Sequence, residues 1–309
     1  AGPVERARNL LPQFFQKRNF DLEKAKDGLR QMLWGFFKKI VIADSCAPIV
    51  NDIFSNYSGY NSSTLVFGVI LFAFQIYGDF SGYSDIAIGT ARLFGFNLMK
   101  NFSFPYFSRS ITEYWRRWHI SLSTWFRDYL YIPLGGSHCS KLKQIRNIVI
   151  TFSVSGLWHG ASWTYIFWGF ANGLLFIPGI LKKQKLETEV VAENKFLPSF
   201  REILQLFITF WSINLTVIFF RSESIKDAFI FFKRIFTSNF FEIPKFIDIS
   251  VLWIFVLLIF EWFQRKKEHA MQINNLKRIL RWIIYYIFAI IIFYYFNVNS
   301  GQTFIYFQF

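Results

Sequence analysis

The chain has 309 residues, of which 53% are hydrophobic, 22% aromatic and 17% charged, and Phe alone occurs 42 times. A chain this rich in apolar residues cannot stay disordered in water. Ordinary soluble domains carry about a quarter charged residues, so the low charged fraction indicates a membrane protein. The chain has two cysteines, Cys46 and Cys139, which excludes a disulfide scaffold. Its 34 Lys and Arg residues outnumber its 20 acids but are scattered between apolar runs, which argues against nucleic-acid binding.

Uncharged runs mark the candidate membrane spans, because a helix that crosses a bilayer needs about 20 mostly apolar residues. In chain order these runs are 53–78, 147–181, 203–220, 251–263 (broken only by Glu261) and 282–309. The second run is too long for one upright helix and contains five glycines and Pro178, so it predicts two spans or one span plus a re-entrant segment.

Residues 33–50 are apolar but contain Lys38, Lys39 and Asp44, which predicts a tilted or interfacial helix. The whole pattern predicts an all-α, multi-pass membrane protein with five to seven membrane helices. Basic links at 182–195 and 265–281 are separated by two spans and are expected on one face, the cytoplasmic one.

The absence of an internal repeat or a low-complexity linker favours a single membrane domain over 1–309, with 1–178 as its motif-bearing part and 179–309 as C-terminal helices. The chain begins at Ala1 rather than Met and shows no signal peptide. We therefore expect a fragment whose earlier membrane helices are missing.

Polar residues inside apolar segments are informative, since each needs a partner there. The first such cluster, 77–85, contains Asp79 and Asp85 with small residues between them. It has two interpretations of equal weight: a helix break with close backbone packing, or a cavity whose carboxylates orient Arg or His side chains from neighbouring helices.

The second cluster, 111–131, has apolar residues at helical spacings of three and four and charges on most of the opposite arc. This pattern predicts an amphipathic helix lying in the membrane interface, ended by Pro133, Gly135 and Gly136. His119 falls on the apolar side. A lone histidine there more often satisfies a local hydrogen bond than acts in a reaction.

The third cluster, 155–162, places His159 between Gly156 and Gly160 in the long uncharged run. Burial lowers an imidazole pKa and keeps the neutral form available as a base, so a functional role is favoured over a polar contact joining two helices. His138 and Cys139 lack zinc-site spacing, His269 beside Glu268 is expected to be solvated, and no metal site is predicted.

Four segments in this order resemble the membrane-bound O-acyltransferases, and within them the bacterial branch of alginate O-acetyltransferases and related polysaccharide acetylation proteins. They are QIYGDFSGYSDIAIG (75–89), NFSFPY (101–106), EYWRRWHISLSTWFRDYLYIPLGG (113–136) and GLWHGASW (156–163). The resemblance is specific over residues 1–178 and rests on hydrophobic pattern alone from residue 181 onward. It implies a helical bundle around a tunnel, with interfacial amphipathic and re-entrant helices.

The resemblance also implies transfer of an acetyl or other acyl group from a cytoplasmic thioester, such as acetyl-CoA, to a hydroxyl acceptor, without a permanently bound cofactor. By motif, His159 and His119 are the catalytic candidates, with His159 acting as base or nucleophile. Further substrate-binding or tunnel-lining candidates are Trp118, Ser121, Arg116, Arg127, Asp128, Asp79 and Trp158. The arginines, Arg117 among them, would meet either coenzyme A phosphates or lipid headgroups.

For the cell, the resemblance implies a bacterial inner-membrane protein in contact with lipids, an extracytoplasmic acetyltransferase partner and polysaccharide assembly proteins. The acceptor stays open between alginate, cellulose, peptidoglycan, another exopolysaccharide and a small hydroxylated molecule, and D-alanyl is an alternative cargo. A transporter or channel with intramembrane His and Asp residues is the competing interpretation, and a scaffold for an acetylation complex is a third.

Overall fold

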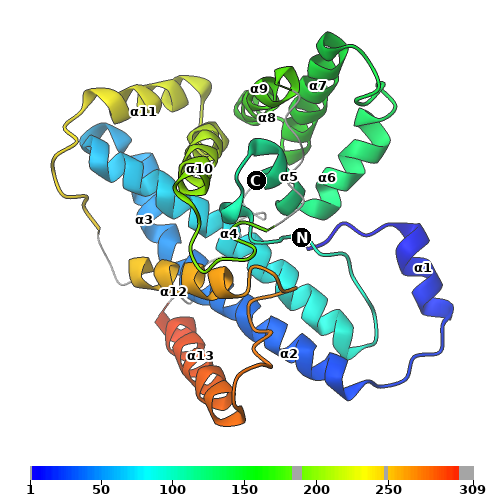
Figure 1. Cartoon of the computed structure of the whole chain (residues 1–309). Helices are drawn as coiled ribbons and strands as arrows, with labels where there is room; N and C mark the ends of the chain where they lie inside the picture. The colour runs from blue at the N-terminus through cyan, green and yellow to red at the C-terminus, as the bar shows by residue number, and fades with distance from the viewer. Residues whose placement is uncertain (1, 183–189, 247–249, 299–309) are drawn as a thin grey trace. The chain divides into compact units, whose positions relative to one another are not determined.

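The computed structural model describes residues 2–182, 190–246 and 250–298, and every regular element within these ranges is a helix (Figure 1). Four helical segments in the described ranges are long and apolar enough to cross a membrane: Ser62–Leu93, Trp163–Leu181, Phe200–Arg221 and Arg278–Val298. A shorter apolar helix covers Val251–Phe263. The predicted all-α membrane fold class is confirmed, with four full-length candidates and one short helix where five to seven were expected.

Two compact units divide the chain. Unit 1 comprises Ala1–Pro48, Phe74–Phe104 and Ile247–Gln308, and unit 2 comprises Ile49–Ala73, Pro105–Phe246 and Phe309. The predicted single domain over 1–309 stays a prediction. In the basic link at 182–195, residues 183–189 lie outside the described residues.

Unit 1 is built from helices at both ends of the chain and the second half of a long central helix. Its elements are α1 (Ala7–Phe15), α2 (Leu22–Phe36), the π-helix η1 (Phe37–Ala43), the later part of α4 (Ser62–Leu93), α12 (Ser250–Phe263) and α13 (Arg278–Val298). Asp21 starts α2 by accepting hydrogen bonds from the backbone N–H groups of Glu23 and Lys24. Residues 33–50, expected as one tilted helix, fall in the end of α2, in η1 and in the start of α3 (Asp44–Ser55).

Glycines bring the backbones of α2 and α4 together inside unit 1. A Cβ on Gly35 would lie 2.7 Å from the carbonyl oxygen of Gly82, and one on Gly82 would lie 2.7 Å from that of Gly35. Gly28 and Gly89 repeat this arrangement seven residues away on each helix. One interpretation of the 77–85 segment was a helix break with close backbone packing. The helix break is wrong, because α4 continues through this segment to Leu93. The close backbone packing is confirmed by the glycine contacts between α2 and α4.

Unit 2 holds the second and third polar clusters, 111–131 and 155–162. Its elements are the later part of α3, the 3₁₀ turn η2 (Tyr57–Gly59), the first part of α4, the 3₁₀ turn η3 (Pro105–Phe107), α5 (Ile111–Arg117), α6 (Ile120–Phe126), the π-helix η4 (Arg127–Tyr131), α7 (Lys141–His159), α8 (Trp163–Leu175), α9 (Ile177–Leu181), α10 (Phe200–Arg221) and α11 (Ile225–Thr237).

The long uncharged run at 147–181 becomes a helical hairpin of α7 and α8, drawn in green in Figure 1. The chain reverses at Gly160–Ser162, where the Ser162 hydroxyl accepts a hydrogen bond from the backbone N–H of Thr164 and starts α8. Glycines again permit the contact: a Cβ on Gly156 would collide with the carbonyl oxygen of Tyr165, and one on Gly169 with that of Phe152. α10 then packs on α8, where Asn172 Nδ2 donates to Thr216 Oγ1 at 3.0 Å.

Candidate functional site

The segment predicted as one amphipathic helix, 111–131, is broken in the middle. α5 ends at Arg117, α6 begins at Ile120, and the break falls at Trp118 and His119. His119 has φ 44° and ψ 52°, a left-handed backbone conformation that non-glycine residues adopt uncommonly. Non-glycine residues in this region are found preferentially at functional sites, where the surrounding structure holds them. The apolar spacing correctly predicted a helix on each side of His119 but did not predict the break between the two helices.

The turn before the break is fixed by its charged residues. Ser110 accepts a hydrogen bond from the backbone N–H of Glu113, and the Glu113 carboxylate pairs with Arg117 at 2.8 Å and with Arg109 at 3.2 Å. Glu113 is buried, and a buried carboxylate requires partners such as these two arginines. This clamp holds α5 and positions the chain that leads into His119. From the sequence, Glu113 and Arg117 were expected on the polar face of a helix, with Arg117 meeting coenzyme A phosphates or lipid headgroups; their pairing with each other was not predicted.

His119 is buried, with 4% of its surface exposed, so its place on the apolar side is confirmed. Burial and the neighbouring His159 lower its pKa to about 3. His119 lies outside the four candidate spans. At neutral pH its imidazole is therefore uncharged and can accept a proton at one ring nitrogen.

His159 is the last residue of α7, at the turn of the helical hairpin. Its ring packs against Trp158, Trp168 and Phe220 at centroid distances of 5.1, 5.4 and 5.2 Å. Burial in this aromatic surround lowers the pKa of His159, which also lies outside the four spans, to about 4. Gly156 and Gly160 both accommodate Tyr165 of α8: Gly156 lies against its carbonyl oxygen and Gly160 against its ring.

The structure brings the two histidines into one aromatic cluster. The rings of His119 and Trp158 are 6.4 Å apart, and Trp158 in turn contacts His159. Trp158 is 52% exposed, so the side chain shared by the two histidines reaches the surface of unit 2. The predicted tunnel past these residues stays a prediction.

The other candidates in unit 2 lie in different environments. Trp118 is buried and stacks on Tyr114 at 5.5 Å, and Ser121 is buried at the start of α6. Arg127 and Asp128 pair with each other at 2.7 Å, with 57% of the Arg127 side chain exposed. Arg116 is exposed as well. Exposed guanidinium groups beside an aromatic cluster fit either a phosphate or a lipid headgroup.

Asp79 belongs to unit 1. It is buried and pairs with Lys39 at 2.8 Å, and Lys39 also reaches Asp44 at 2.6 Å. Asp85 pairs with Lys38 at 2.6 Å. The partners of the two carboxylates are thus lysines from η1 rather than the expected Arg or His side chains. Burial raises the pKa of Asp44 to about 6, although Lys39 opposes this shift.

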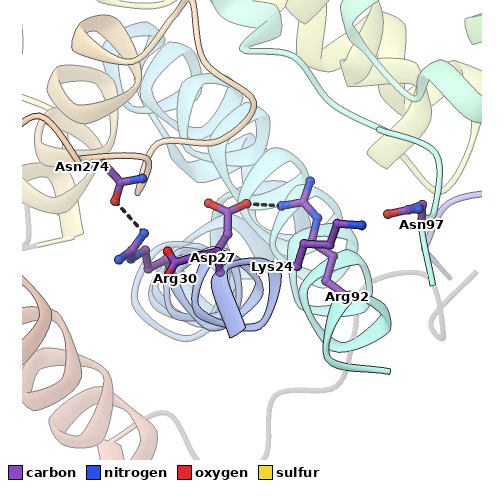
Figure 2. Close-up of a pocket in the computed structure, with 7 residues that line it drawn as sticks. Lys24, Asp27, Arg30, Arg92, Asn97 and Asn274 are labelled. Carbon is purple, nitrogen blue, oxygen red and sulfur yellow. Dashed lines mark hydrogen bonds and ion pairs between the residues drawn. The ribbon is translucent and has the colours of Figure 1, made fainter. Parts of the chain in front are cut away.

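Unit 1 also has a polar pocket of about 380 Å³ at the ends of α2 and α4 (Figure 2). Asp27 pairs there with Arg92 at 2.6 Å, and Arg30 donates to Asn274 at 2.6 Å. His269 was expected to be solvated, which is wrong: it is 2% exposed and contacts Asp27 at 3.1 Å. In the described ranges no three His, Cys, Asp or Glu side chains gather in a metal-binding arrangement.

Sequence analysis missed Trp168 and Phe220, which pack against His159, and Trp115, which packs against Trp168 at 6.0 Å. The signal that was available is the glycine spacing. Gly156 lies four residues before the turn at 160–162 and Gly169 seven residues after it, so each helix carries a glycine where the two backbones come into contact. Placing the turn there puts α8 against the end of α7 that carries His159.

Comparison with known proteins agrees with the motif segments. The family model described as "MBOAT, membrane-bound O-acyltransferase family" matches residues 1–218, which extends beyond residue 178 where the motif resemblance ended. The probable alginate O-acetylase AlgI of Azotobacter vinelandii is 50% identical over 173 residues, covering 56% of this chain and 34% of the relative.

Two further relatives align over more of the chain. The probable alginate O-acetylase AlgI of Pseudomonas aeruginosa is 38% identical over 245 residues, covering 79% of this chain and 45% of that protein. The peptidoglycan O-acetyltransferase of Helicobacter pylori is 37% identical over 230 residues, covering 74% and 42%. The chain therefore spans less than half the length of each of these relatives.

Proposed function

Because the chain belongs to the membrane-bound O-acyltransferase family, we propose that it carries the catalytic histidines of an enzyme that transfers an acyl group from a thioester to a hydroxyl. One observation carries the proposal: His119 and His159, from two separate motif segments, meet at Trp158 with lowered pKa values. A neutral imidazole is what a general base at neutral pH requires.

The chemistry assigned to His159 is proton transfer. As the acceptor hydroxyl oxygen forms its bond to the acyl carbonyl carbon, the neutral imidazole takes the hydroxyl proton. The bond between carbonyl carbon and sulfur then breaks, and the proton passes from the imidazolium to the thiolate. In the second version His159 attacks the carbonyl itself and carries the acyl group until the hydroxyl displaces it. Both versions start from uncharged His159.

His119 fits a positioning or proton-shuttling role. Its ring contacts Trp158 rather than His159 directly in the ring contacts described, and its backbone is held in a left-handed conformation. A residue kept in that conformation by the Glu113 clamp presents its ring in one orientation. Trp118, Ser121, Arg116, Arg127, Asp128 and Trp158 remain substrate-binding or tunnel-lining candidates within unit 2. Asp79 remains a candidate within unit 1.

For the substrates, the relatives support an acetyl group and a polysaccharide. The names of two relatives refer to alginate and that of a third to peptidoglycan. We propose acetyl-CoA or another cytoplasmic acyl thioester as donor and a hydroxyl of an extracellular polysaccharide such as alginate as acceptor. A D-alanyl cargo is the alternative that a donor comparison would reveal.

For the cell, we propose a multi-pass protein of the bacterial inner membrane that works beside an extracytoplasmic acetyltransferase and polysaccharide assembly proteins. The four candidate spans support insertion in a membrane. Transfer toward an external polysaccharide starting from a cytoplasmic thioester needs passage across the bilayer, and this need supports a partner on the outer side.

The test is radiolabelled acetyl transfer in membranes that contain the complete gene product carrying these residues. We expect His159→Ala to insert normally and to lose transfer, by a factor of about 10²–10⁴ for the loss of a general base. His138→Ala, an exposed histidine in the loop before α7, is the matched control and should leave transfer unchanged. A transporter would instead move solute without consuming any thioester, and its transport would be independent of acyl donor.

A further inference from the structure

Trp168 has a buried hydrogen-bond donor that packing does not explain. The residue is 8% exposed in α8, and its indole N–H has no hydrogen-bond partner among the described residues. Buried donors are nearly always paired, and one that is not requires an explanation such as a missing ligand or a role in catalysis. The aromatic contacts of Trp168 need its ring but not its N–H, since phenylalanine makes the same edge-to-face contacts.

The position of this donor is close to the reaction centre proposed above. The Trp168 ring meets the His159 ring edge to face, at 5.4 Å and 85°. Phe220 packs on both rings, at 5.2 Å from His159 and 5.1 Å from Trp168. The donor and the imidazole therefore belong to one apolar cluster in unit 2, where a hydrogen bond is stronger than in water.

Acyl transfer creates a need for such a donor. When a nucleophile adds to a thioester, the carbonyl oxygen becomes an oxyanion, and hydrogen-bond donors placed in advance stabilise it. This need is the same whether His159 acts as base or as nucleophile, because both routes pass through a tetrahedral intermediate. The described ring contacts of His159 are those with Trp158, Trp168 and Phe220.

We propose that the Trp168 indole N–H donates a hydrogen bond to the carbonyl oxygen of the acyl group while it is transferred at His159. The indole keeps its proton throughout, and the charge on the oxygen collapses back when the carbon–sulfur bond breaks. Trp168 is thus a donor to the substrate, and its identity as Trp rather than Phe is functional. This inference rests on the proposed acyl transfer at His159.

The test compares Trp168→Phe with Trp115→Phe in the complete gene product. Trp115 is the matched control, since its indole N–H is also buried and without a partner in the described residues, while its ring contacts Trp168 and not His159 in the described ring pairs. We expect Trp168→Phe to lower kcat for transfer from acetyl-CoA by roughly 10²-fold with little change in KM, as loss of one oxyanion donor does. Trp115→Phe should retain most of its kcat.

Replacement of Trp168 by 3-benzothienylalanine, which keeps the shape of the indole and lacks the N–H, gives the same expectation without a packing change. A second readout is the infrared carbonyl frequency of ¹³C-labelled acetyl-CoA bound to the His159→Ala protein. The frequency should rise when Trp168→Phe is added, because the hydrogen bond is lost.

Equal effects of the Trp168 and Trp115 variants, an isostere with unchanged kcat, or a carbonyl frequency that does not respond would each overturn the inference. Trp168 would then pair with a bound water. These outcomes are separate from failure of the proposed function, which would appear as full transfer by His159→Ala alone.

Discussion

The rings of His119 and His159 pack against the same indole, that of Trp158, at centroid distances of 6.4 and 5.1 Å. One histidine comes from the break between α5 and α6, and the other from the end of α7. Removal from water disfavours the charged form of each imidazole. Repulsion from a charged His159 would further lower the pKa of His119. The pair is therefore held in its unprotonated state over the physiological pH range.

This state predicts an unusual pH dependence of activity. With pKa values near 3 and 4 in the folded protein, both imidazoles stay neutral well below the ordinary value of 6.5. We expect the acid limb of kcat/KM for acetyl transfer to lie below pH 5. An acid limb centred near pH 6.5 would contradict the burial of His159.

The same shifts make stability depend on pH. The unfolded chain takes up protons on these histidines as pH falls through 6.5, whereas the folded protein does so only near pH 4 and below. Protons thus favour unfolding, and stability is lost as pH falls from about 6.5 to 4. Thermal unfolding midpoints in detergent should drop over this interval. The variant His119→Asn, His159→Gln should show a flatter slope than the parent protein.

The left-handed conformation of His119 predicts which substitutions the α5–α6 break tolerates. His119→Asn and His119→Gly can adopt φ 44° with little strain, whereas a β-branched residue cannot. We expect His119→Val to unfold at a lower temperature than His119→Gly, with a difference in stability of about 1–2 kcal/mol. All three should lose activity. Equal stability of the Val and Gly variants would show that the break can relax to another conformation.

Backbone contact between α7 and α8 predicts that Gly156→Ala is severely destabilising. The new methyl group would overlap the carbonyl oxygen of Tyr165, which a rotamer change cannot relieve. We expect a loss of about 3 kcal/mol or more in the free energy of unfolding. Gly59→Ala is the matched control, because a Cβ there meets nothing within 4 Å, and it should change stability by less than about 0.5 kcal/mol.

The buried ion pairs of unit 1 predict a non-additive pair of substitutions. Lys38 and Asp85 are 3% and 15% exposed and lie 2.6 Å apart, with Gln31 donating to the same carboxylate. Lys38→Met strands a buried charge and should cost about 3–5 kcal/mol. Adding Asp85→Leu should recover much of that loss.

An exposed pair provides the comparison for this cycle. Lys26 and Glu23 are 45% and 77% exposed, and Lys26→Met should cost less than about 0.5 kcal/mol. Chemical unfolding of the purified protein in detergent measures all three variants. If Lys38→Met behaves like Lys26→Met, the unit 1 carboxylates reach water.

How much of this could be predicted from the sequence depends on the kind of signal. Uncharged runs located the later membrane helices closely: the run at 203–220 lies within α10, and the run at 251–263 lies within α12. These predictions succeed because the tendency of an apolar stretch to form a buried helix depends on its own residues and not on distant ones. The family resemblance located both histidines, whose motifs are local.

What could not be predicted depends on distant contacts. The break at His119 leaves no periodicity signal, since α5 and α6 each keep helical spacing, and a histidine is not the usual residue for a left-handed position. His269 was expected in water because its neighbours along the chain are charged, and its partner Asp27 lies far away in sequence. The lysine partners of Asp79 and Asp85 follow from glycine-mediated packing of α2 on α4, which hydrophobicity does not reveal.

Gly156 and Gly169 leave α7 and α8 no clearance for even a methyl group between their backbones. Two helices fastened that closely move as one rigid body, and His159 and Trp168 move with them. The motion that the proposed transfer requires would then be taken up at the break between α5 and α6, at Trp118 and His119, rather than between α7 and α8.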